Sequence, residues 1–168
     1  MSAQAQTKES ADDLRSLYQE IILDHGRHPR NLRQVEHATC KAQGNNPMCG
    51  DKVTVTARVS KDGVIEDLAF EGKGCAISIA SASMMTTVLK GRSVDSSRRL
   101  FAAIQSLCSG KSEMADAKQA VPELAESIDE LAALSGVRQF PVRVKCATLP
   151  WHALVACLDG GGLATTEK

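Results

Sequence analysis

The stretch that decides the fold is Val53-Thr54-Val55-Thr56-Ala57-Arg58-Val59, followed by Lys61-Asp62-Gly63 and the run from Val64 to Phe70. Apolar and polar residues alternate along the first segment, which is typical of a strand with one buried face. A Lys-Asp-Gly turn between two such runs predicts a β-hairpin. The rest of the chain can be placed around this hairpin.

One further strand and a series of helices are expected outside the hairpin. The strand lies around Glu36–Ala42, ahead of an Asn45-Asn46-Pro47 turn. Apolar spacing, first-turn residues and glycine stops predict the helices. They run from Asp12 or Asp13 to Gly26, from Cys75 to Gly91, from Asp95 to Cys108, from Pro122 to Gly136 and from Thr148 to Leu158. Phe140-Pro141 is expected to begin an extended segment that leads to Cys146. Strands followed by helices indicate an α+β fold.

The composition is that of an ordinary globular domain. Of 168 residues, 43% are apolar and 24% are charged, and Lys plus Arg equal Asp plus Glu at 20 each. A zero formal charge gives no field to attract nucleic acid or an anionic membrane. No apolar run reaches the roughly 20 residues that cross a bilayer. We expect one domain over residues 11–158, a disordered N-terminus at 1–10 and a flexible tail at 159–168.

The N-terminal dozen residues are polar and lack the apolar stretch of a signal peptide, which favours a cytoplasmic protein. Thiols stay reduced in that compartment, and a chain of this length does not need disulfides to fold. The six cysteines are therefore interpreted as metal ligands or reactive thiols in preference to three disulfides.

Three potential metal ligands lie at the two ends of the hairpin. Cys49 and Asp51 precede its first strand, and two positions apart on an extended chain they project to the same side. Cys75 follows its second strand, at a helix N-terminus that favours a thiolate. Because the hairpin is antiparallel, its start and its end lie side by side, which predicts that Cys75 is close to Asp51.

The other cysteines are less well defined by spacing. Whether Cys146 reaches the same point stays open on the residues alone, since distant ligands cannot be found from a local pattern. Cys108 and Cys157 lie on apolar helix faces and are expected to be small buried hydrophobes. Cys40 is expected to be structural as well. The four histidines lack the spacing of metal ligands, and packed or surface roles are favoured for them.

Cations accompany every candidate ligand. Three thiolates and one carboxylate around Zn²⁺ carry a net charge of −2, which nearby positive charge would stabilise. The cations are Lys52 beside Asp51, Lys73 before Cys75, and Arg143 and Lys145 before Cys146.

Three motifs follow one another along the chain. They are Asn45-Asn46-Pro47-Met48-Cys49-Gly50-Asp51, Gly72-Lys73-Gly74-Cys75-Ala76-Ile77-Ser78, and the longer Phe140-Pro141-Val142-Arg143-Val144-Lys145-Cys146-Ala147-Thr148-Leu149-Pro150-Trp151. Together they resemble the SufU family, zinc-dependent sulfurtransferases related to the IscU and NifU N-terminal scaffolds of iron–sulfur cluster assembly. The resemblance extends over about residues 14–158.

The resemblance implies an α+β fold with a three-stranded antiparallel sheet and packed helices. It also implies that Cys49, Asp51, Cys75 and Cys146 bind one Zn²⁺. The protein would take persulfide sulfur from a SufS-type cysteine desulfurase and pass it to downstream iron–sulfur assembly proteins.

The chemistry of such a site favours one of its thiols as the sulfur acceptor. A carboxylate among thiolates makes a zinc site more labile than four thiolates would. Cys49, on a turn, is therefore expected to be displaced from the metal by a desulfurase ligand and to accept the sulfur. Arg143 is the candidate for docking the partner or stabilising the anionic sulfur.

An IscU-like scaffold is the main alternative, with a transient iron–sulfur cluster on Cys49, Cys75 and Cys146 and iron in place of zinc. Three features favour the SufU type. Lys145 stands where IscU has a histidine, the segment between Cys75 and Cys146 has room for an extra helix, and the Leu-Pro-Pro-Val-Lys motif of IscU is absent. A module in which zinc only supports folding is the third possibility.

Overall fold

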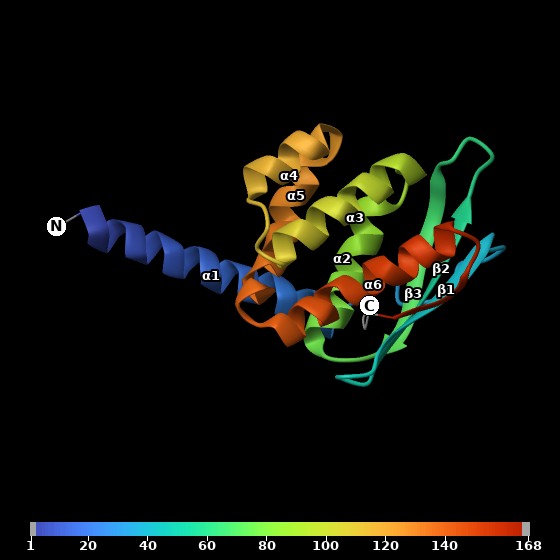
Figure 1. Cartoon of the computed structure of the whole chain (residues 1–168), viewed down its shortest axis with the longest axis horizontal. Coiled ribbons are helices and arrows are strands. Elements are labelled where there is room, and N and C mark those ends of the chain that lie inside the picture. The colour runs from blue at the N-terminus through green and yellow to red at the C-terminus, as the bar shows by residue number, and fades with distance from the viewer. Residues whose placement is uncertain (1–2, 166–168) are drawn as a thin grey trace.

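The computed structural model describes the backbone of residues 3–165 and the side chains of residues 13–161. In Figure 1, α1 projects from one side of a group of helices, and the sheet lies on the opposite side. The elements, in chain order, are α1 (Ala3–Arg27), β1 (Cys40–Asn46), β2 (Asp51–Val59), β3 (Ile65–Lys73), α2 (Ala76–Leu89), α3 (Val94–Cys108), α4 (Met114–Ala120), η1 (Pro122–Leu124), α5 (Ala125–Leu131), η2 (Ala132–Gln139), α6 (Pro141–Leu158) and β4 (Gly162–Thr165).

The sheet has the strand order β3-β2-β1-β4. β2 pairs antiparallel with β1 on one side and with β3 on the other, which confirms the expected α+β fold with three antiparallel strands. β4 adds to the edge in parallel with β1 and was not predicted.

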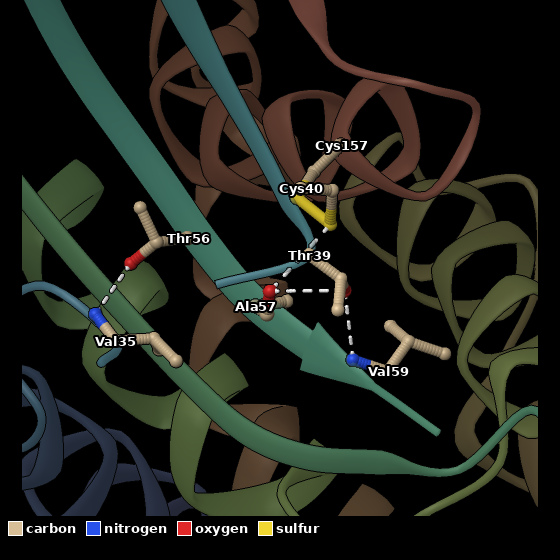
Figure 2. Close-up of a disulfide and its surroundings, with 7 residues drawn as sticks. All are labelled: Val35, Thr39, Cys40, Thr56, Ala57, Val59 and Cys157. Atoms are coloured by element: carbon tan, nitrogen blue, oxygen red, sulfur yellow. Dashed lines mark hydrogen bonds between the residues drawn. A yellow bond between two sulfur atoms is a disulfide. The ribbon is translucent and has the colours of Figure 1, made fainter. Parts of the chain in front are cut away.

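The β2–β3 hairpin forms as the alternation predicts. Val53, Val55 and Ala57 are fully buried on one face of β2. Gly63 has φ 79° in the connecting turn, a conformation that glycine adopts without a steric penalty. Thr56 is buried on the opposite face, where its Oγ1 accepts a 3.0 Å hydrogen bond from the Val35 amide (Figure 2).

β1 lies further along the chain than predicted, and the expected strand at Glu36–Ala42 is wrong in its bounds. Pairing with β2 continues to the Asn46–Asp51 pair, so both asparagines of the expected turn belong to the strand. The reversal is confined to residues 47–50, where Gly50 has φ 72°. A longer ladder forms more backbone hydrogen bonds, and it places Cys49 in a tight loop at the end of the two central strands.

Helices α2 and α6 pack against each other, with α6 also on β1 and β2 and α2 on β3. Ser81 joins the two helices because its Oγ accepts from Trp151 Nε1 at 3.0 Å and donates to the Ala147 carbonyl at 2.5 Å. Trp151 is fully buried. This contact fixes the register of α6 on α2. Because α2 begins directly after Cys75, the contact also sets where α6 lies relative to Cys75.

The extended segment predicted before Cys146 is wrong, because α6 begins at Pro141. Proline fits the first turn of a helix, where its missing amide is not needed. Pro150 lies inside α6 and cannot donate to the carbonyl of Cys146 four residues earlier. The buried packing of Trp151 and its neighbours maintains one continuous helix through this proline.

Residues 122–139 form three short helical pieces in place of the single predicted helix that ended at Gly136. α4 was not predicted. In the part of the chain that the structure describes, no helix combines the length and the apolar character that a bilayer crossing requires.

The structure differs from the expected disordered ends on both sides. α1 starts at Ala3, since the Ala, Gln, Lys and Glu residues there favour helix. Gly160 and Gly161, with φ 117° and 90°, turn the chain so that β4 reaches β1. The parts of those predictions that fall on residues 1, 2 and 166–168 lie outside the described residues. The domain division itself stays a prediction.

A disulfide joins Cys40, at the start of β1, to Cys157, near the end of α6 (Figure 2). Their Cα atoms are 5.3 Å apart, within the range that a disulfide spans. The expectation that Cys157 is an unpaired buried hydrophobe is therefore wrong, and the 117-residue separation explains why no local pattern revealed the pair. Cys108 is buried as expected, and burial raises the pKa of its thiol to about 12.

Candidate metal centre

Asn46 holds the loop that carries Cys49. Its carbonyl accepts hydrogen bonds from the amides of Cys49 at 3.2 Å and Gly50 at 2.8 Å. Its side-chain Oδ1 accepts from the Met48 amide at 3.3 Å. Asn46 is buried whereas Cys49 is exposed, so the loop presents an accessible thiol from a fixed base.

Asp51 connects the start of β2 to the start of α2. Its carboxylate is buried, and Oδ1 accepts the Cys75 amide at 3.0 Å while Oδ2 lies 3.8 Å from Cys75 Sγ. Gly74 is required at this point, since a Cβ there would lie 2.8 Å from Asp51 Oδ1. The predicted proximity of Asp51 and Cys75 across the ends of the hairpin is confirmed.

Cys146 reaches the same place from α6. Its side chain is fully buried, and its Sγ lies 3.5 Å from Cys49 Sγ and 3.6 Å from Asn46 Nδ2. The ligand atoms of Cys49, Asp51 and Cys146 all lie within 4.8 Å of one another. The structure thereby joins residues nearly one hundred positions apart in the sequence.

Cys75 is the fourth candidate ligand and is placed differently from the other three. It is half-buried at the N-terminus of α2 and contacts Asp51. Among the residues that the structure describes, the cluster within 4.8 Å contains only Cys49, Asp51 and Cys146. Three of the four predicted ligands therefore converge, and the fourth adjoins their carboxylate.

The donor set fits zinc. Two thiolates on a tetrahedral Zn²⁺ lie roughly 3.8 Å apart when each bond is about 2.3 Å, and the Cys49 and Cys146 sulfurs are separated by 3.5 Å. Thiolates with one carboxylate are ligands that zinc accepts, and thiolates are also the ligands of iron–sulfur clusters. Cys49, Asp51 and Cys146 would hold the metal, with Cys75 adjacent to complete the set.

The electrostatics of the centre depend on burial and on Arg143. Burial, followed by the contact with Cys49, raises the pKa of the Cys146 thiol above its usual range. A metal ion must therefore displace a proton from Cys146 in order to bind. The negative charge of Cys75, followed by a hydrogen bond with Cys146, raises the pKa of the Arg143 guanidinium.

The structure also tests the predicted roles of the histidines and shows a role for Asn46 that was not predicted. His25 Nδ1 is 2.7 Å from Ser83 Oγ, and His152 packs edge-on against Phe101 with ring centroids 5.1 Å apart, so packed roles are confirmed for both. Asn46 was missed because an Asn-Asn-Pro sequence predicts a turn. Its place three residues before Cys49 is the signal that could have indicated a partner of the site.

Comparisons with known proteins show the family of this chain. Residues 17–147 match the NifU-like N terminal domain. The chain belongs to this family. The zinc-dependent sulfurtransferase SufU of Bacillus subtilis is 40% identical over 154 residues, covering 89% of this chain and 96% of that protein. The iron–sulfur cluster assembly scaffold protein IscU of Streptococcus pyogenes is 37% identical over 141 residues, covering 84% and 82%.

Solved structures of the NifU-like family share the fold. A crystal structure from Fervidobacterium islandicum, described as a putative iron–sulfur cluster assembly scaffold protein for the SUF system, superposes with a TM-score of 0.67 at 28% identity. The superposition covers 83% of this chain and 94% of the Fervidobacterium chain. The predicted resemblance to the SufU and IscU proteins is confirmed.

Proposed function

We propose that this protein is a zinc-dependent sulfur acceptor that takes persulfide sulfur from a SufS-type cysteine desulfurase for iron–sulfur cluster assembly. The observation that carries the proposal is the contrast within one thiol pair: Cys49 is exposed and Cys146 is buried, 3.5 Å away. The similarity to SufU of Bacillus subtilis over nearly the whole of both chains supports it. The cytoplasm is the proposed place of action, although the Cys40–Cys157 disulfide is of a kind that this compartment seldom maintains.

The proposed sulfur transfer is an exchange between sulfur atoms. Zinc, when bound, keeps its thiol ligands deprotonated at neutral pH. The Cys49 thiolate attacks the terminal sulfur of the desulfurase persulfide, so one S–S bond forms at Cys49 and the S–S bond on the desulfurase breaks. The desulfurase cysteine leaves as a thiolate, and no external oxidant or reductant is consumed.

The surroundings of Cys49 suit a docking partner. Met48, Phe140 and Val142 are large apolar side chains that are 66%, 59% and 51% exposed. Met48 precedes Cys49, and Val142 lies one helical turn before Cys146, where its carbonyl is 3.7 Å from the Cys146 Sγ. Exposed apolar residues beside a charged group are typical of an interface core and its rim. Arg143 is the proposed cation for docking or for stabilising the anionic sulfur.

A single-turnover experiment tests the proposal. The zinc-loaded protein is mixed with a SufS-type desulfurase and cysteine, and the persulfide is mapped by peptide mass spectrometry after trapping. We expect the added sulfur on Cys49 and an increased desulfurase turnover. Cys108, buried with a raised thiol pKa, is the internal control. Sulfur that remains on the desulfurase, or that appears on all free thiols equally, would contradict the proposal.

A scaffold that assembles a transient iron–sulfur cluster on Cys49, Cys75 and Cys146 is the second candidate. The similarity to IscU of Streptococcus pyogenes over 84% of this chain favours it, and thiolates are the ligands such clusters need. Anaerobic reconstitution with iron and sulfide separates the two functions. A stable cluster that transfers to an apo-acceptor, with iron bound in preference to zinc, would select the scaffold.

A further inference from the structure

The side chain of Asn46 joins the loop of Cys49 to the helix of Cys146. Asn46 is the last residue of β1 and is 1% exposed. One end of its amide contacts the Met48 amide at 3.3 Å, and the other end contacts Cys146 Sγ at 3.6 Å. A buried amide that is satisfied at both ends fixes the distance between the two groups it contacts.

The chemistry of these contacts sets the direction of the amide. The Met48 N–H can only donate, so the carbonyl oxygen of Asn46 must face it. The amide nitrogen then faces Cys146 and donates to its sulfur. An N–H donor stabilises a thiolate, lowers the electron density on the sulfur and makes it a weaker nucleophile. The side chain of Asn46 makes no comparable contact with Cys49 Sγ among the described residues.

We infer that Asn46 is a positioning residue that makes Cys146 the fixed ligand of the metal centre and leaves Cys49 as the exchangeable thiol. The inference rests on the zinc binding in the proposed function. Two chemically identical side chains 3.5 Å apart would otherwise compete for the incoming sulfur. The amide donor on Cys146, together with the burial of that thiol, separates their roles, so Asn46 determines which thiol accepts sulfur.

Two substitutions separate the sulfur contact from the anchoring of the loop. Asn46→Ser keeps a short acceptor that can cap the Met48 amide, as serine does in equivalent turns, but it is too short to reach Cys146. Asn46→Ala removes both contacts. The matched control is Asn45→Ala, the adjacent asparagine of β1, whose Oδ1 is buried and makes no hydrogen bond in the described structure.

The measurement is the alkylation pattern of the zinc-loaded protein, with no desulfurase present. Iodoacetamide is added, and the labelling of Cys146 relative to Cys49 is followed by peptide mass spectrometry. The wild-type chain and Asn45→Ala should be labelled at Cys49 first, with Cys146 protected. Asn46→Ser and Asn46→Ala should raise the Cys146-to-Cys49 ratio roughly tenfold, the lower end of the change in metal affinity or activity that loss of a partner of a metal ligand causes.

A second readout is the sulfur-to-metal charge-transfer band after replacement of zinc by cobalt. Loss of the N–H donor should move this band to lower energy in both Asn46 variants but not in Asn45→Ala. Unchanged alkylation ratios and an unchanged band in Asn46→Ser would overturn the inference and reduce Asn46 to a loop anchor. A wild-type chain that binds no zinc would overturn it too. A shifted ratio in a protein that accepts no desulfurase sulfur would support the inference while the proposed function fails.

Discussion

Strand β1 and helix α6 lie against each other and carry a pair of cysteines at each end. At one end Cys40 and Cys157 form a disulfide. At the other end Cys49, just beyond the strand, and Cys146, in the second turn of the helix, are 3.5 Å apart and unbonded. Cysteine therefore has a different role at each end of this strand–helix pair. It forms a structural disulfide at one end and a candidate metal site at the other.

The neighbours of each pair account for the difference. The Cys40–Cys157 link lies among sheet and helix backbone, with Cys157 buried and the Ala57 carbonyl 3.9 Å from Cys40 Sγ (Figure 2). The Cys49–Cys146 pair has a buried carboxylate, an amide donor and a guanidinium beside it. Proximity of two thiols therefore does not define their chemistry; the donors and charges around them do.

The largest expected effect comes from removing the exposed thiol. Cys49→Ser should lower sulfur acceptance from the desulfurase to the level of a protein-free reaction, because the thiolate is the nucleophile. The measurement is the rate of desulfurase turnover together with persulfide mapping. Cys108→Ser, at a buried thiol away from the centre, should retain the wild-type rate. Normal acceptance by Cys49→Ser would assign the acceptor to another residue.

Removing the disulfide at the opposite end of β1 and α6 should lower stability and leave sulfur acceptance intact. Cys157→Ser should lower the free energy of unfolding by about 2–4 kcal/mol, the range for disulfides, since this one closes a long segment of chain. Urea unfolding with and without reductant measures it, and reductant should destabilise the wild type by the same amount. Sulfur acceptance should stay within twofold. A large loss of acceptance would show that the two ends are coupled.

The positive charge of Arg143 should affect the rate of sulfur transfer more than the affinity for zinc. Arg143→Ala should slow sulfur transfer roughly tenfold at low ionic strength, because a positive charge attracts the anionic persulfide. Arg143→Lys should recover part of that rate. Competition with a chromogenic zinc chelator should show a smaller change in zinc affinity than in transfer rate, because Lys52, Lys73 and Lys145 remain near the site. Equal transfer rates for the alanine variant and the wild type would remove Arg143 from the mechanism.

The smallest effect concerns the ion pair between Arg33, which precedes β1, and Asp67 of β3. It serves as a reference for changes in the free energy of unfolding. Arg33 contacts Asp67 at 2.8 Å and 3.0 Å, and its side-chain hydrogen bond lowers the pKa of Asp67. A lowered carboxyl pKa stabilises the fold above pH ~4 and loses that contribution as pH falls through the folded-state value. Asp67→Asn should therefore lower the free energy of unfolding by about 1 kcal/mol at pH 7, since Arg33 is partly exposed.

The same Asp67→Asn protein should lie closer to the wild type at pH 2 than at pH 7, because at pH 2 the unfolded carboxyl has taken up a proton while the native one, with its lowered pKa, has not. Urea unfolding at the two pH values measures the difference. An equal loss of stability at both would assign the effect to packing instead of charge.

Local sequence patterns were enough to predict the hairpin and the Asp51–Cys75 contact. Strand alternation and a glycine turn are properties of neighbouring residues, and an antiparallel hairpin returns its second end to its first. The three-stranded sheet and the family followed from motifs of the same local kind. These predictions needed no knowledge of how α6 packs.

Contacts that depend on α6 could not be obtained in this way. The convergence of Cys146 on Cys49 and the Cys40–Cys157 disulfide both need the position of a helix far along the chain. Phe140-Pro141 was interpreted as the start of an extended segment, whereas α6 begins at Pro141 and packs through Trp151 on Ser81. Asn46 was hidden for the same reason, since its partner Cys146 lies on that helix.

The proposed function requires that Cys49, Asp51, Cys75 and Cys146 share one zinc ion. X-ray absorption at the zinc edge of the stoichiometrically loaded protein tests this directly. We predict one zinc per chain with three sulfur neighbours at about 2.3 Å and one oxygen at about 2.0 Å, with the sulfur number falling to two in Cys146→Ser. A zinc shell of nitrogen and oxygen, or one that Cys146→Ser leaves unchanged, would contradict the account.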